Sequence, residues 1–169
     1  KTIIGSLLFG NRMLFLYSEL SCLLSELANR FDDRLKTVIL FGSRARGDFS
    51  EESDYDLFLV AEGLALEPIQ RLREVRLVLL QCPIHANFVA KTPQELQANL
   101  SPLVLDVCVD GICLIGESWL KPYREKALRA VREAGLKRKR LGKERFWEFQ
   151  SQPVGDWELS WEGYREIPV

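Results

Sequence analysis

The chain has 169 residues, of which 47% are hydrophobic and 28% are charged, and its formal net charge is −1. This composition is typical of a globular domain, and a chain of this length needs neither a metal ion nor a disulfide to fold. No run of about 18 uncharged apolar residues occurs, and no signal-peptide cleavage site follows the apolar start, so we expect no membrane segment and a cytoplasmic location.

The cysteines are Cys22, Cys82, Cys108 and Cys113, and the single histidine is His85. They form no CxxC pair and have no partnering histidines, so a structural zinc site is not expected. Each cysteine lies among apolar residues. This favours four small buried thiols in a reducing compartment.

Hydrophobic periodicity and capping signals predict an alternation of helices and strands. In chain order the expected elements are a helix through residues 16–31, a strand at 37–41, a strand at 55–61, a helix at 66–81, a strand at 84–90, helices at 93–100 and 102–109, a strand at 112–115 and a helix at 118–134. Thr92, Pro93 and Glu95 give the first of the paired helices a capping box. We expect an α+β fold, a small mixed sheet with helices packed on one face.

A basic segment follows, because residues 121–145 contain eleven Lys or Arg and three Glu. Together with the aromatic residues at 146–149, this segment fits a surface that binds RNA. It also fits a helix that docks on the domain with its charges in water, and the near-neutral chain favours this second interpretation. The docking residues would be Leu128, Val131, Ala134 and Leu136.

The most informative segment is residues 38–60, VILFGSRARGDFSEESDYDLFLV. Asp54 and Asp56 fall on one face of the strand expected at 55–61, because side chains alternate along a strand. Two neighbouring carboxylates repel each other unless a cation lies between them, and Mg²⁺ or Mn²⁺ suits such oxygen ligands. An Asp-x-Asp pair alone also fits a solvated strand edge.

The glycine-serine turn before this strand adds a site for phosphate. Gly42 has no Cβ, so backbone amides and the Ser43 hydroxyl can approach a phosphate closely. Arg44 and Arg46 add positive charge beside it. Asp54 follows Gly42 by twelve positions.

This combination of a strand, GSRARG and DxDLxxV resembles the minimal nucleotidyltransferases of the DNA polymerase β superfamily. The likeness covers about residues 20–116. Residues 135–149 (GLKRKRLGKERFWEF) are also similar to the C-terminal part of relatives that occur beside HEPN-domain proteins. The resemblance implies a mixed sheet with helices and two metal ions held by aspartates.

By position, the resemblance makes Asp54 and Asp56 the catalytic metal ligands. It makes Gly42 and Ser43 ligands of the triphosphate, with Arg46 as a weaker candidate for the same role. The implied reaction is in-line attack at the α-phosphorus of ATP or another nucleoside triphosphate, with release of pyrophosphate.

One position departs from the family pattern. Active members carry a third carboxylate on the next core strand, where this chain has Asn87 and no Asp or Glu between residues 83 and 92. Alternation places His85 on the same face as Asn87, so an imidazole and an amide occupy the third position. Either can also be an ordinary hydrogen-bonded residue at a strand end. Asp106 and Asp110 lie in or after an expected helix, and we assign them no catalytic role.

The residues and the resemblance together predict an enzyme that transfers AMP from ATP, with Mg²⁺ or Mn²⁺, to a hydroxyl of a protein or RNA. The resemblance also implies a role as the antitoxin of a pair whose toxin has a HEPN domain. The alternative is a weak or inactive relative that acts by binding a partner. We divide the chain into an extension (1–19), a nucleotidyltransferase core (20–118) and a basic helix with a Trp-rich tail packed on the core (119–169). A homo-oligomer is left open.

Overall fold

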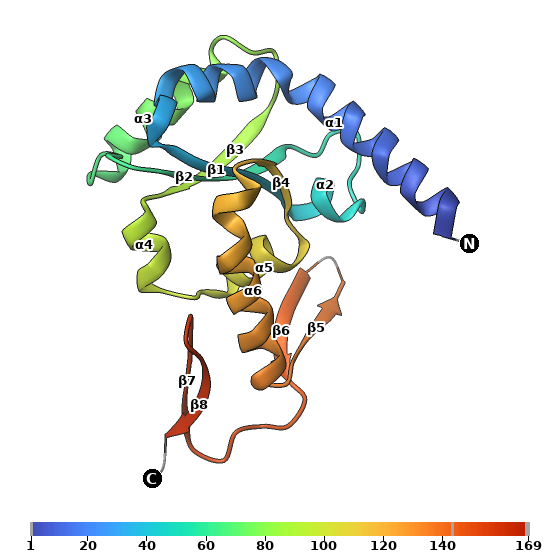
Figure 1. Ribbon diagram of the computed structural model, residues 1–169, viewed down its shortest axis with the longest axis vertical. Helices are drawn as coiled ribbons and strands as arrows, with labels where there is room; N and C mark the ends of the chain where they lie inside the picture. Colours follow the sequence, from blue (N-terminus) through green and yellow to red (C-terminus); the bar gives the residue numbers. More distant parts are fainter. Residues whose placement is uncertain (1, 143, 168–169) are drawn as a thin grey trace.

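The computed structural model describes residues 2–142 and 144–167, with side chains from residue 14 onward. Six α-helices, one 3₁₀ helix and eight strands follow one another along this part of the chain (Figure 1). The helices are α1 (Thr2–Phe31), the 3₁₀ helix η1 (Asp32–Arg34), α2 (Gly42–Arg46), α3 (Pro68–Leu79), α4 (Pro93–Ala98), α5 (Pro102–Asp110) and α6 (Glu117–Glu133). The strands are β1 (Leu35–Phe41), β2 (Tyr55–Ala61), β3 (Ala86–Lys91), β4 (Ile112–Ile115), β5 (Leu136–Leu141), β6 (Glu144–Phe149), β7 (Asp156–Ser160) and β8 (Gly163–Ile167).

A four-stranded sheet forms the centre of the fold, in the order β3-β2-β1-β4. Strand β2 pairs antiparallel with β1 and parallel with β3, and β1 also pairs antiparallel with β4. The sheet is therefore mixed. The expected α+β class, a mixed sheet flanked by helices, is confirmed.

Helices cover both faces of this sheet, so the expectation that they pack on one face is wrong (Figure 1). Val38 and Leu40 are buried in a core with α1 and α3. Ile39, Phe58 and Val60 point the other way, into a second core with α4, α5 and α6. The apolar runs of β1 and β2 are continuous rather than alternating because both of their faces are buried.

The first helix packs along one face through the residues that the periodicity indicated. Leu20, Leu23, Leu27 and Phe31 are fully buried. Helix α1 is continuous from Thr2, so it runs through the boundary that the sequence placed between residues 19 and 20. Residue 1 lies outside the described residues.

The expected capping box of α4 is confirmed. The Thr92 side chain accepts a hydrogen bond from the Glu95 amide, and the Glu95 carboxylate accepts one from the Thr92 amide. Helix α3 begins two residues later than expected, at Pro68, because the Glu67 side chain caps it by accepting from the amides of Ile69 and Gln70.

The basic helix expected at 118–134 is α6, and two β-hairpins follow it where the sequence indicated only a Trp-rich tail. Strands β5 and β6 form the first hairpin and β7 and β8 the second, so five of the eleven Lys and Arg residues of the basic segment lie on strands. The buried Trp161 joins the second hairpin to the core by donating its Nε1–H to the Leu96 carbonyl over 2.8 Å. Leu128, expected to dock α6, is 39% exposed instead. Residues 168–169 of the expected tail lie outside the described residues.

The cysteines also differ from expectation. Cys22 in α1 and Cys82 after α3 form a disulfide across 60 residues, a pairing that depends on α1 lying beside α3 and that spacing alone does not reveal. Cys108 and Cys113 are free thiols, and burial raises the pKa of Cys108 to about 12 and that of Cys113 to about 11. None of the helices in the described part of the chain is long and apolar enough to cross a membrane.

Candidate active site

Asp56 lies against the glycine-serine turn where β1 ends. Its partner in the β1–β2 register is Phe41, the last residue of β1, so Asp56 and Gly42 are brought together by strand pairing. Gly42 has a φ of 73°, and a Cβ at this position would lie 2.3 Å from Asp56 Oδ2. Only glycine therefore fits here, for both backbone and contact reasons.

Asn87 joins this group from the neighbouring strand. Parallel pairing sets Asp56 beside Asn87, and the Asn87 side-chain amide donates to Asp54 Oδ2 over 3.3 Å and to Asp56 Oδ1 over 3.4 Å. Both carboxylates thus face one point. The structure brings together the two aspartates, the glycine and the amide that the sequence singled out.

The donor set suits a hard divalent cation. Two carboxylates that converge on one amide supply oxygen ligands, and Mg²⁺ is commonly held by one or two carboxylates while waters and substrate phosphates complete its shell. In residues 2–142 and 144–167, no group of three or more His, Cys, Asp or Glu side chains is placed to hold a metal ion. The pair therefore supplies two of the oxygen ligands that such an ion takes, and Asn87 lies beside it on β3.

The other residues of the GSRARG segment make separate contacts through the backbone and the side chains. The Ser43 carbonyl accepts from the amides of Gly47 and Asp48, which closes the single turn of α2. Arg44 lies 4.1 Å above the Tyr55 ring and donates to the Ser53 carbonyl, so it holds the loop before Asp54 rather than lying free for a phosphate. Arg46 lies at the other end of α2 from Ser43.

A hollow of about 460 Å³ lies beside Asp54 and includes His85. The Tyr55 hydroxyl donates to Glu19 on its wall, and burial together with this hydrogen bond raises the pKa of Tyr55 to about 12. The His85 side chain is exposed, and its backbone carbonyl accepts from the Tyr55 amide. His85 thus lies in the hollow beside Asp54, directly before β3 begins at Ala86 and outside the strand expected at 84–90. The lining residues are Glu19, Arg44, Glu51, Glu52, Ser53, Asp54, Tyr55, Pro83, Ile84 and His85.

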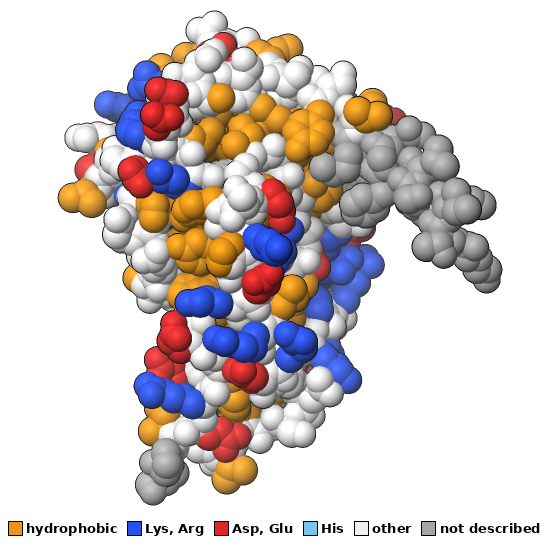
Figure 2. All heavy atoms as spheres, in the orientation of Figure 1, with side chains coloured by type: hydrophobic (Ala, Val, Ile, Leu, Met, Phe, Trp, Pro, Cys, Tyr) orange, Lys and Arg blue, Asp and Glu red, His pale blue; other side chains and the backbone are white. Residues whose placement is uncertain are grey.

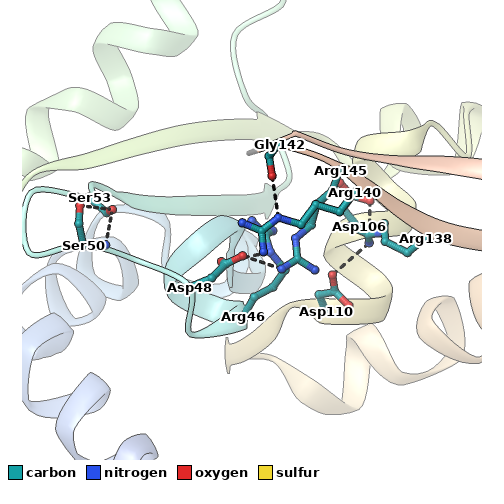
Figure 3. Close-up of polar contacts among 10 residues, drawn as sticks. All are labelled: Arg46, Asp48, Ser50, Ser53, Asp106, Asp110, Arg138, Arg140, Gly142 and Arg145. Carbon is teal, nitrogen blue, oxygen red and sulfur yellow. Dashed lines mark hydrogen bonds and ion pairs between the residues drawn. The ribbon is translucent and has the colours of Figure 1, made fainter.

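A second charged group, which we call the arginine cluster, lies where the first hairpin meets α2 and α5 (Figure 3). Its members are Arg46, Asp48, Asp106, Asp110, Arg138, Arg140 and Arg145. Arg138 pairs with Asp106 over 2.8 Å and with Asp110 over 3.1 Å. Sequence reasoning did not predict this cluster, because its members lie in three segments up to 99 residues apart.

Trp147 completes the contact between the hairpin and α5. Its Nε1–H donates to Asp106 over 2.7 Å, and Arg138 lies 4.4 Å above its ring. Burial raises the pKa of Asp106, while the hydrogen bond from Trp147 and the charge of Arg138 act in the opposite direction. Asp106 and Asp110 therefore anchor the hairpin.

Lys and Arg side chains gather over α6 and the hairpins on the lower half of the face seen in Figure 2, with Asp and Glu side chains between them. Several of these form ion pairs, such as Lys126 with Glu162 and Arg129 with Glu133. The basic segment is thus partly neutralised by its own neighbours.

A family model described as polymerase beta, nucleotidyltransferase matches residues 24–101. This stretch is a little under half of the chain, and over it the chain is similar to the polymerase β nucleotidyltransferases. The match contains the glycine-serine turn, both aspartates and Asn87. The resemblance seen in the sequence is confirmed, and the arginine cluster draws on both this stretch and the chain that follows it.

Two proteins of Methanocaldococcus jannaschii that carry the name of protein adenylyltransferases are similar to the chain. One is 50% identical over 36 residues, 21% of this chain and 36% of the relative. The other is 32% identical over 89 residues, 50% of this chain and 60% of the relative. The chain thus spans less than two thirds of the length of these relatives.

Two solved structures have a limited likeness in fold to this chain. A Sulfolobus solfataricus protein named a nucleotidyltransferase has a TM-score of 0.45 at 21% identity, over 61% of this chain and 82% of that one. A complex of a tri-AMPylated Shewanella oneidensis HEPN toxin with an MNT antitoxin has a TM-score of 0.35 at 18% identity, over 66% and 87%.

Proposed function

We propose that the chain is a metal-dependent nucleotidyltransferase that transfers AMP from ATP to a hydroxyl group. The observation that carries this proposal is the convergence of Asp54 and Asp56 at the turn of Gly42. A rigid pair of carboxylates beside a glycine turn is an arrangement that holds a cation and a polyphosphate together.

Each residue has a role in this proposal. Asp54 and Asp56 hold Mg²⁺ or Mn²⁺, which would neutralise charge on the phosphates of the bound nucleotide. Gly42 and Ser43 position the triphosphate through the backbone and the serine hydroxyl. The gain in rate comes from orientation of the α-phosphorus toward the acceptor, because phosphoryl transfer depends mainly on positioning and charge stabilisation.

His85 and Asn87 lie at the third position. An amide takes up no proton at neutral pH, whereas an imidazole does. His85, exposed in the hollow beside Asp54, is therefore our candidate for the base that deprotonates the acceptor hydroxyl. Replacement of His85 by Gln is expected to lower kcat for transfer and to leave the affinity for Mg²⁺–ATP unchanged, because the base acts on the acceptor and not on the nucleotide.

The acceptor and partner are the finer parts of the proposal. The names of the Methanocaldococcus jannaschii relatives favour a protein acceptor. A HEPN-domain toxin as the partner follows from the sequence resemblance. An RNA acceptor is the competing prediction.

A second candidate function is supported by Asn87 itself. Where a carboxylate would complete the metal site, this amide donates to both aspartates. A chain in which this arrangement persists would keep the fold and act on a partner by contact, without transfer. Asn87→Asp separates the candidates, because it should raise transfer by a weak enzyme and change nothing in a binding protein.

The first test is calorimetric titration of ATP with Mg²⁺, using a non-hydrolysable analogue, into the wild type and into Asp54→Asn/Asp56→Asn. We expect binding by the wild type and a loss of about 100-fold or more in the double variant, since both charged ligands are removed. Equal affinity of the two proteins, or binding by neither, would overturn the metal-nucleotide site and leave partner binding as the function.

A further inference from the structure

The arginine cluster has more positive than negative charge around Asp48. Arg145 donates to Asp48 Oδ2 over 2.6 Å, and Arg46 Nε lies 3.4 Å from Asp48 Oδ1. The hydrogen bond from Arg145 is the main reason why the pKa of Asp48 is lowered. One carboxylate therefore faces two guanidinium groups.

A third guanidinium lies beside these two. Arg140 is the register partner of Arg145 across the hairpin, so two like charges are held side by side. Arg140 donates through Nε to the Gly142 carbonyl over 2.7 Å. Within residues 2–142 and 144–167, no carboxylate lies within ion-pair distance of Arg140.

The hairpin separates its charges by face. Arg138, Arg140, Arg145 and Trp147 alternate onto the side toward α2 and α5, whereas Lys137 and Lys139 point to the other side with Glu148. Figure 3 shows the guanidinium groups of Arg46, Arg140 and Arg145 directed toward the same region around Asp48. Like charges directly opposite each other destabilise a sheet, so this arrangement has a cost in the absence of an anion.

This region adjoins the glycine-serine turn. The Asp48 amide donates to the Ser43 carbonyl over 3.1 Å, and the Gly47 amide donates to it over 2.8 Å. Arg46 follows Ser43 by three residues of one helical turn, a rise of about 5 Å along the axis. Asp48 therefore links the two regions, because its amide contacts the Ser43 carbonyl and its carboxylate contacts Arg46 and Arg145.

We propose that Arg46, Arg140 and Arg145 form a polyphosphate-binding site that takes the terminal phosphates of the nucleotide. This inference rests on the proposed function. Arginine presents five N–H donors in a fixed planar group, so a single carboxylate leaves donors for a phosphate. Asp48 orients the arginines, and the first hairpin, which lies outside residues 24–101, supplies two of the three.

The test compares Arg140→Ala with Lys137→Ala in the full chain. Both variants remove one positive charge from β5, and they differ in the face of the hairpin from which it is removed. Inorganic tripolyphosphate without metal, ATP with Mg²⁺ and AMP with Mg²⁺ are titrated calorimetrically. A single-stranded oligouridine is the fourth probe, because nucleic acid also presents phosphates.

Arg140→Ala should lower the affinities for tripolyphosphate and ATP about tenfold, as expected for the loss of one charge-assisted hydrogen bond. The affinity for AMP should stay within about twofold of the wild-type value. Lys137→Ala should leave all affinities within about twofold, because an exposed charge on the other face acts only through screened long-range attraction. Equal losses of tripolyphosphate affinity in both variants would show that the effect comes from overall positive charge and not from the face that carries Arg140. That result would overturn the proposal. A loss confined to oligouridine would overturn it in favour of nucleic acid.

Failure of this inference and failure of the proposed function give different results. Asp54→Asn/Asp56→Asn should lose Mg²⁺–ATP binding and keep metal-free tripolyphosphate binding, since it leaves the three arginines in place. If the double variant binds Mg²⁺–ATP like the wild type, the proposed function fails, whatever Arg140 does. If the wild type binds no tripolyphosphate, the arginine site fails, whatever the aspartates do.

Discussion

The aspartate pair and the arginine cluster are two charged groups built in different ways. Asp56 and Asn87 are neighbours in the register of β2 and β3, and Asp54 comes directly before β2. The arginine cluster depends on side chains that reach across the gap between a hairpin and two helices. We therefore expect the first group to be sensitive to backbone changes and the second to changes of charge.

The largest expected effect comes from Gly42→Ala, which tests the backbone side of this comparison. The new Cβ would lie 2.3 Å from Asp56 Oδ2, and φ at this position is 73°. We expect Mg²⁺–ATP affinity to fall by about 100-fold or more, and the free energy of unfolding to fall by about 2 kcal/mol from the strained backbone. Calorimetric titration and urea denaturation measure the two effects.

Gly135→Ala is the matched control. Gly135 has a φ of 60°, but a Cβ there would meet nothing within 4 Å. The control should therefore lose about 1 kcal/mol of stability and keep nucleotide affinity. Similar nucleotide affinities in both variants would show that contact with Asp56 is not what demands glycine.

Arg138→Ala tests the charge side of the comparison. It leaves Asp106 and Asp110 without their shared cation, and Asp106 is half-buried. The expected loss is about 2 kcal/mol of unfolding free energy, since an unpaired and partly buried carboxylate is costly. Urea denaturation measures it.

Lys139→Ala provides the control on the same strand. Lys139 pairs with Glu148 on the exposed face, and such pairs contribute about 0 to 1 kcal/mol. If the two variants lose the same stability, then the hairpin is not held by Arg138, and the arginine cluster is a solvated surface.

The contrast between the two groups also explains what the sequence could predict. Alternation along the strand at 55–61 placed Asp54 and Asp56 on one face, and the family resemblance put Asn87 at the third position beside them. These positions are correct because strand register propagates along the backbone. Their chemical roles stay predictions, since position alone does not establish a metal or a reaction.

The first hairpin was missed for a physical reason. Its strand β5 alternates Lys137, Arg138, Lys139 and Arg140, so both faces are basic and no polar-apolar alternation marks a strand. The two faces differ only in the residues that they contact. Arg138 pairs with Asp106, which lies 32 residues earlier in the chain, so the local sequence pattern does not reveal this contact. Such pairings depend on the packed tertiary structure, as does the Cys22–Cys82 disulfide.

A smaller effect is expected from Trp147→Phe. The ring volume is largely kept, but the hydrogen bond from Nε1 to Asp106 is lost. The loss should be about 1 kcal/mol of unfolding free energy. Because Trp147 and Arg138 share Asp106, the double variant Arg138→Ala/Trp147→Phe should deviate from additivity by about 0.5 kcal/mol or more, whereas strict additivity would mean that the two contacts are independent.

Glu95→Gln should have the smallest effect on stability. Glu95 makes both a local contact that depends on the backbone and a long-range contact that depends on charge. Glu95 closes the local capping box with Thr92 and also accepts from Arg71, 24 residues away, over 2.7 and 2.8 Å. The hydrogen bonds from Arg71 are the main cause that lowers the pKa of Glu95 below its usual 4.5. Because Glu95 is partly exposed, we expect a loss of only about 1 kcal/mol at pH 7.

The pH dependence of the unfolding free energy separates the contribution of the Glu95 charge from that of the helix cap. A carboxyl whose pKa is lower in the folded state stabilises the fold fully above its unfolded pKa, and this contribution is lost as the pH falls through the folded pKa. The stability gap between wild type and Glu95→Gln should therefore be constant above about pH 5 and narrow in more acidic solution. Gln retains an oxygen that can accept from the Thr92 amide, so a gap that does not change with pH would assign the loss to altered capping geometry rather than to the charge paired with Arg71.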